Sequence, residues 1–175
     1  MTDNDIRTAP ADILWCCKCG TPMITREVAG KPRRACPACR HIHFIEPKVG
    51  VGVCVVQDGA ILLVQRRFAP EKGKWSIPAG YLDHGDDPAL HAVREVHEET
   101  GLVVALRGLA GVFHNPPEQG GASVFILYRG ERTGGQLRAG DDASDAGFFA
   151  PDSLPEIAFA STRHAVALLG GDSTG

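Results

Sequence analysis

The sequence lacks any uninterrupted apolar run near the length of about 18 residues that a membrane-spanning helix requires, so we expect no transmembrane segment. Its start, MTDNDIRTAPADILW, contains acids and no apolar core stretch, which disfavours a signal peptide. An excess of one charge is missing too, because 18 basic and 21 acidic residues leave a net charge of −3. This balance argues against binding to membranes or nucleic acid over the whole surface. We therefore expect a cytoplasmic protein.

The composition predicts a folded chain with two parts. Hydrophobic residues make up 43% of 175 residues, enough for one packed domain and a small appendage. Cysteine pairs, prolines and little periodic apolar pattern precede residue 46, and strand-like runs follow it. We therefore expect an N-terminal segment at residues 1–45 and a second domain at residues 46–175. Because disulfides are rare in the cytoplasm, the six cysteines are expected to be thiols or metal ligands.

Four of these cysteines have the spacing of a zinc site. Two Cys-x₂-Cys pairs are separated by sixteen residues, and they are Cys16, Cys19, Cys36 and Cys39. This spacing is typical of a structural Zn²⁺ in a zinc ribbon, where four thiolates form a closed tetrahedral site. His41 and His43 are alternative ligands, but the four-cysteine set makes them unnecessary. Cys17 is poorly spaced for the same metal, and Cys54 is expected to be a buried apolar residue.

The remainder alternates strand and helix patterns. Strands are predicted at 49–56 and 60–66 around the turn Asp58-Gly59, and again at 103–113 and 122–129, followed by a polar loop at 130–147. Asp87, Pro88 and Gly101 predict a helix over Pro88–Thr100, because they suit its cap, its first turn and its end. A second helix is expected near the C-terminus. This order indicates an α/β class, a sandwich around a mixed sheet.

Three like charges crowd the end of the predicted helix. Glu95, Glu98 and Glu99 fall within roughly 100° of arc on helical geometry, opposite the expected core stripe of Ala89, Val93, Val96 and Thr100. Both their mutual repulsion and the helix dipole disfavour this arrangement. A bound divalent cation would reverse both effects, since Mg²⁺ prefers oxygen ligands. The alternative is an ordinary solvated acidic face.

The surrounding residues resemble the Nudix box. The 23 residues from Gly80 to Leu102 follow the family pattern. They consist of Gly80, five residues, an acid, seven residues and then REVHEETGL. One position departs from it: Asp86 stands where the family has glutamate. The sequences ILLVQRR, GKWSIPAG and GFFAPDSLP are similar to flanking Nudix segments. The resemblance implies a Nudix α/β/α sandwich with a mixed sheet, preceded here by the small zinc ribbon.

The resemblance also implies a chemistry. Nudix enzymes hydrolyse a nucleoside diphosphate linked to a group X, using Mg²⁺ or Mn²⁺. Glu95, Glu98 and Glu99 would then hold the metal, and Arg94 would orient neighbouring acids such as Asp86 or Glu98. Gly80 would let its backbone carbonyl approach the metal.

Other candidates lie outside the box. Arg66 and Arg67 suit a phosphate, although they could equally be an exposed strand end. Asp142 is the leading general base, with Glu118, Asp141 and Asp145 as rivals and a solvated acidic loop as the alternative. Inside the box, His91 lies on the glutamate face one turn before Glu95, where it could contact substrate, and His97 lies nearer the apolar side; neither is assigned a role. The loops at 113–122 and 134–147 should determine the substrate specificity, and Glu118 should contact the substrate. Phe113 and Trp75 are the nearby aromatic residues that could stack on an adenine or flavin ring. For Trp75, a place in the core is favoured instead.

Several motifs reduce the number of candidate substrates. The stretch GVFHNPPEQGGAS disfavours NADH specificity, and EPKVGVGV and GKWSIPAGYL resemble zinc-ribbon enzymes that act on ADP-ribose or FAD. We therefore expect an ADP-X substrate, ADP-ribose or FAD. The alternatives are a nucleoside triphosphate and, in a different class, a non-catalytic nucleotide- or RNA-binding regulator. A nucleotide is the expected partner, nucleic acid and membranes are not, and a homodimer is compatible with the sequence.

Overall fold

The computed structural model describes residues 12–115, 122–140 and 142–171. The chain forms two compact units, Met1–Glu46 and Pro47–Gly175. That the sequence divides into separate functional domains at residues 45 and 46 stays a prediction, because compactness does not show that each part folds or acts alone.

The first unit is a small sheet with almost no apolar core. Its strands are β1 (Ile24–Val28), β2 (Lys31–Ala35) and β3 (Ile42–His43), in the order β1-β2-β3. Ala29 and Gly30, both with positive φ, form the tight turn between β1 and β2. Among the described residues of this unit, the buried hydrophobic cluster is Cys16, Met23 and Cys36, and Ala35 is also buried. A core this small does not supply enough burial to hold a fold, so a staple such as a metal is needed.

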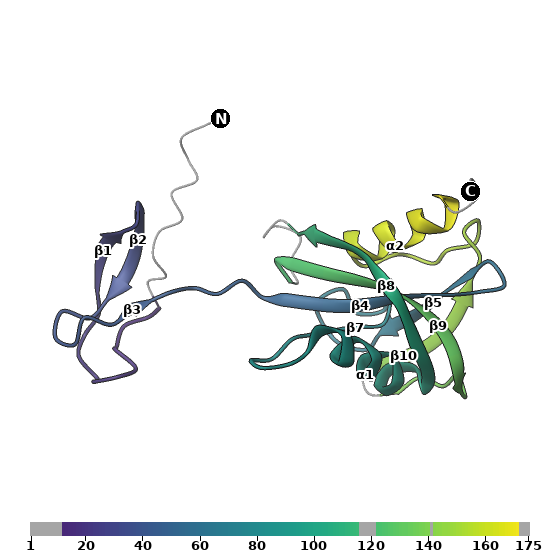
Figure 1. Ribbon diagram of the computed structural model, residues 1–175, viewed down its shortest axis with the longest axis horizontal. Coiled ribbons are helices and arrows are strands. Elements are labelled where there is room, and N and C mark those ends of the chain that lie inside the picture. The colour runs from purple at the N-terminus through teal and green to yellow at the C-terminus, as the bar shows by residue number, and fades with distance from the viewer. Residues whose placement is uncertain (1–11, 116–121, 141, 172–175) are drawn as a thin grey trace. The chain divides into compact units, whose positions relative to one another are not determined.

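The second unit is built on a mixed sheet (Figure 1). Its main strands are β4 (Val49–Gln57), β5 (Ala60–Arg66), β8 (Leu102–His114), β9 (Val124–Gly135) and β10 (Ala143–Phe149), in the order β10-β5-β4-β9-β8. Only β4 and β9 are parallel among these pairs, which confirms the predicted mixed sheet. Two short strands, β6 (Trp75–Ser76) and β7 (Ala79–Tyr81), pair with β5 and β4.

Two helices cover opposite faces of this sheet, α1 (Pro88–Thr100) and α2 (Ala160–Gly171) (Figure 1). Alternate residues of β4 point to opposite faces. Val51, Val53 and Val55 pack with Ala92 and Val96 of α1. Cys54 packs on the other face with Ala165 of α2, so its predicted burial is confirmed. In the described ranges, no helix combines the length and apolar character needed to cross a bilayer.

Helix α1 has the predicted bounds and caps. The Asp87 side chain accepts hydrogen bonds from the amides of Ala89 and Leu90, and Gly101 ends the helix with a φ of 67°. The polar loop predicted at 130–147 is wrong at both ends: residues 143–147 belong to β10, and residues 130–135 continue β9. Their register pairs Gly135 with Leu102 of β8. This long-range ladder outweighs the loop preference of the local glycines.

Candidate active site

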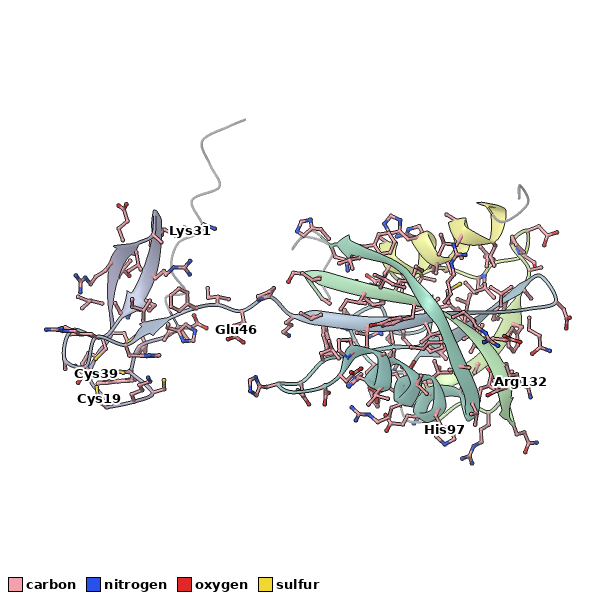
Figure 2. The ribbon with its side chains drawn as sticks, in the orientation of Figure 1. Cys19, Lys31, Cys39, Glu46, His97 and Arg132 are labelled. Atoms are coloured by element: carbon pink, nitrogen blue, oxygen red, sulfur yellow. The ribbon has the colours of Figure 1, made fainter. Side chains whose placement is uncertain are left out.

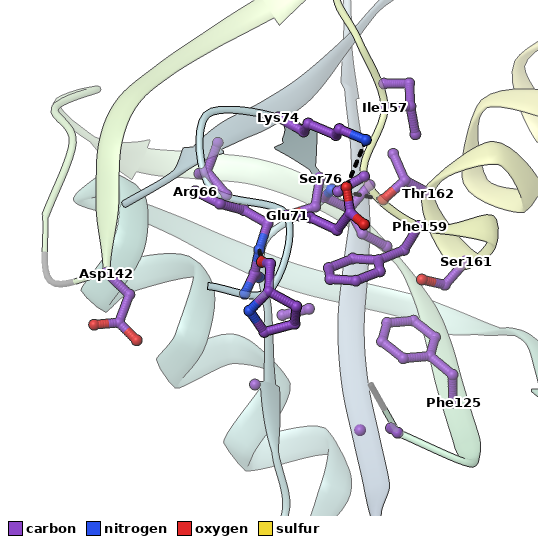
Figure 3. A pocket seen from close by; sticks show the side chains of 18 of the residues that line it. Arg66, Glu71, Lys74, Ser76, Phe125, Asp142, Ile157, Phe159, Ser161 and Thr162 are labelled. Carbon is purple, nitrogen blue, oxygen red and sulfur yellow. Dashed lines mark hydrogen bonds and ion pairs between the residues drawn. The ribbon is translucent and has the colours of Figure 1, made fainter. Parts of the chain in front are cut away.

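A cavity of about 1140 Å³ opens where β4 and β5 part. These strands pair only beside their turn, at Val56–Ile61 and Gln57–Ala60. Further along, β7 pairs with β4 and β6 pairs with β5. The end of α1 and the segment before α2 also contribute to the wall. Figure 3 shows Asp142 on one side of the cavity and the rings of Phe125 and Phe159 on the other.

The three predicted glutamates line this cavity, but in different environments. Glu99 is 9% exposed, and its Oε2 accepts a hydrogen bond from the Ala79 amide at 3.0 Å. Burial raises the pKa of Glu99 to about 8. Burial also raises the pKa of Glu95, whereas Glu98 is exposed. The prediction that all three lie opposite the core face is therefore wrong for Glu99, because the cavity cuts into that face.

Gly80 and His91 enclose the Glu95 carboxylate from two sides. A Cβ on residue 80 would overlap with both oxygens and Cδ of Glu95. His91 Nε2 lies 2.8 Å from Glu95 Oε1, although the orientation is not that of a hydrogen bond. Only glycine therefore leaves room for this carboxylate beside the β7 backbone.

Arg94 lies near both acids predicted as its partners. Its Nη2 is 3.6 Å from Asp86 Oδ2, and its Nε is 3.9 Å from Glu98 Oε1. Both distances exceed hydrogen-bond length. The Asp86 carboxylate instead contacts His91 Nδ1 at 2.7 Å and accepts from the Asp83 amide, and these contacts hold the pKa of Asp86 below its usual range.

The donor set suits a hard divalent cation. Three carboxylates line a cavity that the backbone approaches without side-chain obstruction at Gly80. One of these acids, Glu99, is buried and forms no close ion pair in the described part of the chain, although it feels the charge of Arg66. A cation would favour the ionised form of Glu99, which burial disfavours. The three carboxylates do not yet converge: among the described residues, only the cysteine set brings three or more ligand atoms within 4.8 Å.

Both predicted phosphate-binding arginines line the cavity. Arg66 donates from Nε to the Pro70 carbonyl at 2.8 Å, and its guanidinium lies 4.9 Å from the centre of the Phe159 ring. These contacts fix the side chain at the wall (Figure 3). The position of Phe159 was not anticipated, because no local pattern shows that the segment before α2 returns to β5.

The candidates for the general base differ in whether they line the cavity. Asp142 lines the cavity, and its carbonyl accepts a hydrogen bond from the Arg67 amide at 2.9 Å. Asp145 is not among the described residues of the cavity wall, and its side chain bonds to the Ala146 amide. Glu118 and Asp141 lie outside the described residues.

The predicted stacking rings lie elsewhere. Phe113 stacks on His164 with centroids 4.3 Å apart, and Trp75 contacts Phe149 edge-on. The described residues that line the cavity include neither Phe113 nor Trp75. They do include two exposed rings, Phe68 and Tyr81, at 56% and 50% exposure. Phe68 directly follows Arg67 and Tyr81 directly follows Gly80, so their positions next to predicted site residues were the sequence signal that could have placed them at the cavity.

In the first unit, the four predicted cysteines converge. Their ligand atoms all lie within 4.8 Å, with Cys16 Sγ 3.6 Å from Cys39 Sγ and Cys19 Sγ 3.5 Å from Cys36 Sγ. Figure 2 shows Cys19 and Cys39 close together. Sulfurs at 2.3 Å from a tetrahedral Zn²⁺ lie about 3.8 Å apart, so the cluster has the dimensions of a zinc site. Hydrogen bonds with Thr21 lower the pKa of Cys19 to about 6, which favours the thiolate.

Comparisons with known proteins agree with this geometry. The NUDIX domain model matches residues 46–169. An ADP-ribose pyrophosphatase of Methanocaldococcus jannaschii is 37% identical over 66% of this chain and 69% of its own length. An NAD-capped RNA hydrolase of Stutzerimonas stutzeri is 31% identical over 82% of this chain, which spans only half of that relative. A NUDIX hydrolase structure from Nitrosomonas europaea aligns with a TM-score of 0.80 and 30% identity, over 92% of this chain and 93% of its own.

Proposed function

Because the chain belongs to the Nudix family, whose hydrolases act on pyrophosphate bonds, we propose that it cleaves a nucleoside diphosphate linked to X, namely ADP-ribose or FAD. The observation that carries the proposal is one cavity that holds the box glutamates, Arg66 and Arg67 together. The name of the Methanocaldococcus jannaschii relative supports ADP-ribose. The cavity volume of about 1140 Å³ is large enough for a dinucleotide-sized ligand.

We propose that Glu95, Glu98, Glu99 and the Gly80 carbonyl hold Mg²⁺ or Mn²⁺. A cation there would offset phosphate charge and lower the pKa of a bound water. Arg66 at the end of β5 and Arg67 directly after it would bind phosphate oxygens, since a forked guanidinium matches them. Asp142 would accept the proton of the attacking water, because the other described cavity acids outside α1, Glu71 and Glu156, are both paired with Lys74.

The flat part of the substrate needs a surface to stack on. Phe68 and Tyr81 are the exposed rings at the cavity. Stacking of a base on an aromatic ring contributes about 1–3 kcal/mol in nucleic-acid binders. We propose that these rings, rather than Phe113, contact the adenine or the flavin.

The test is a substrate panel with Mg²⁺ and with Mn²⁺, analysed by HPLC. ADP-ribose or FAD should be cleaved faster than any nucleoside triphosphate, with AMP as one product. Faster cleavage of triphosphates would overturn the substrate assignment and favour the alternative pyrophosphohydrolase. No cleavage by protein that still binds nucleotide would favour a non-catalytic regulator.

A further inference from the structure

We propose that His91 is a positioning residue that holds the Glu95 carboxylate in place, and that it bridges a gap left by the short side chain of Asp86. The inference rests on the proposed function, because it treats Glu95 as a metal ligand. His91 lies among the seven residues between Asp86 and Arg94 that the Nudix pattern leaves unspecified.

His91 stands between two acids inside the site. Its side chain is 5% exposed. Nδ1 lies 2.7 Å from Asp86 Oδ2, and Nε2 lies 2.8 Å from Glu95 Oε1, one helical turn further along α1, in a close contact that is not oriented as a hydrogen bond. Both ring nitrogens therefore face carboxylates, whereas a histidine that only filled space would face apolar atoms.

Asp86 does not reach the arginine of the box. Arg94 Nη2 is 3.6 Å from Asp86 Oδ2, yet only 2.6 Å from His91 Nδ1. Nδ1 cannot donate to Asp86 and accept from Arg94 at the same time, so the two contacts compete for one atom. The imidazole thus occupies the space between the aspartate and the arginine that a longer acid could cross.

The bridge matters because Glu95 has little other support. Glu99 is fixed by the Ala79 amide, but no described backbone amide donates to Glu95. Gly80 limits the carboxylate on one side and His91 on the other. Asp86 is itself tied to the preceding loop through the Asp83 amide at 3.3 Å. A line of contacts therefore connects that loop, through His91, to the proposed metal ligand.

The experiment measures Mn²⁺ affinity by electron paramagnetic resonance without substrate, alongside kcat and KM. The variants are His91→Ala, His91→Asn, Asp86→Glu and the double variant Asp86→Glu with His91→Ala. Asparagine can contact Asp86 but cannot reach Glu95, and it tests the idea if alanine impairs folding. His97→Ala is the matched control, because His97 is exposed on the same helix.

Both single His91 variants should bind Mn²⁺ about 10–100-fold more weakly, as is usual when the support of a metal ligand is lost. His97→Ala should be unchanged. The double variant should bind more tightly than His91→Ala, because the added methylene reaches toward Arg94 through the space that the ring vacates. A role in folding alone would not give this rescue.

Two results would overturn the positioning role while leaving the proposed function intact. One is that the His91 variants bind Mn²⁺ as tightly as His97→Ala does, while Glu98→Gln weakens Mn²⁺ binding. The other is a double variant as weak as His91→Ala. Mn²⁺ binding that Glu98→Gln does not weaken would instead refute the metal site itself, and the role of His91 with it.

Discussion

The Glu95 carboxylate occupies the space that a side chain on residue 80 would need. Gly80→Ala should therefore push Glu95 out of position and lower kcat at limiting Mg²⁺ by about tenfold or more, with the fold retained. Steady-state kinetics over a Mg²⁺ series would measure this. The matched control is Gly134→Ala, where a Cβ would have Val103 Cβ as its nearest neighbour at 3.9 Å. Equal activity of the two variants would contradict the crowding argument.

Glu98 is the most accessible of the three acids, with its side chain 42% exposed. Glu98→Gln should leave the structure and the melting temperature nearly unchanged, because little buried contact is lost. It should lower kcat by several orders of magnitude, since a charged metal ligand is replaced by a neutral one. Glu131→Gln, which removes an exposed acid paired with Arg107, is the control and should retain full activity. Near-normal turnover of Glu98→Gln would remove this helix face from the active site.

Burial makes Glu99 costly to ionise, and this gives a pH dependence. Its pKa is raised to about 8 in the folded protein, above the ordinary value of 4.5. Between these two pH values the folded state binds a proton that the unfolded state has lost. The stability that protonated Glu99 gives is therefore complete below about pH 4.5 and is lost as the pH rises through about 8. Glu99→Gln can still accept the hydrogen bond from Ala79 but never ionises.

In buffer free of Mg²⁺ and Mn²⁺, Glu99→Gln should melt at a higher temperature than the unmodified protein at pH 9, with a smaller difference at pH 5. Differential scanning fluorimetry would measure both. Added Mn²⁺ should stabilise the unmodified protein more at pH 9 than at pH 5, because the ionised carboxylate binds the cation. A difference in melting temperature that does not change with pH would show that Glu99 is already ionised across this range.

Much of the fold was predictable because local signals and tertiary contacts agree. The caps at Asp87 and Gly101 determine where α1 begins and ends, and the positive φ values of Asp58 and Gly59 make the β4–β5 turn. The end of β9 was missed. Nothing in the glycine-rich run 130–135 indicates its pairing with β8, which depends on residues about 30 positions earlier.

The site was predictable where a motif spans one segment. The glutamates and Gly80 belong to the box and line the cavity together, and Arg94 of the same box lies 3.9 Å from one of them, Glu98. Phe68, Tyr81 and Phe159 were missed because their relation to the site depends on how separate segments converge. His91 was placed on the correct side of the helix, but its contacts with Asp86 and Glu95 need the three-dimensional arrangement.

The four-cysteine cluster should hold one structural zinc. Protein purified without chelators should contain about one Zn²⁺ per chain by elemental analysis. Cys36→Ser combined with Cys39→Ser should release it and increase hydrogen exchange in β1–β3, because the apolar core of this unit is too small alone. Cys54→Ser, far from the cluster in sequence and buried against α2, should keep its zinc. Zinc-free protein with a protected first unit would refute the metal as its staple.

Asp142 and Asp145 offer a test of the general base within one short segment. Asp142 lines the cavity, whereas the Asp145 carboxylate bonds to the Ala146 amide and is not among the described wall residues. Asp142→Asn should lower kcat at saturating substrate by about 10²–10⁴-fold, since general bases contribute effects of this size. Asp145→Asn should leave kcat unchanged, because it alters the same kind of side chain outside the cavity. Unchanged turnover of Asp142→Asn would move the proton acceptor to Glu118 or to a glutamate of α1, and a slow Asp145→Asn enzyme would place it further along β10.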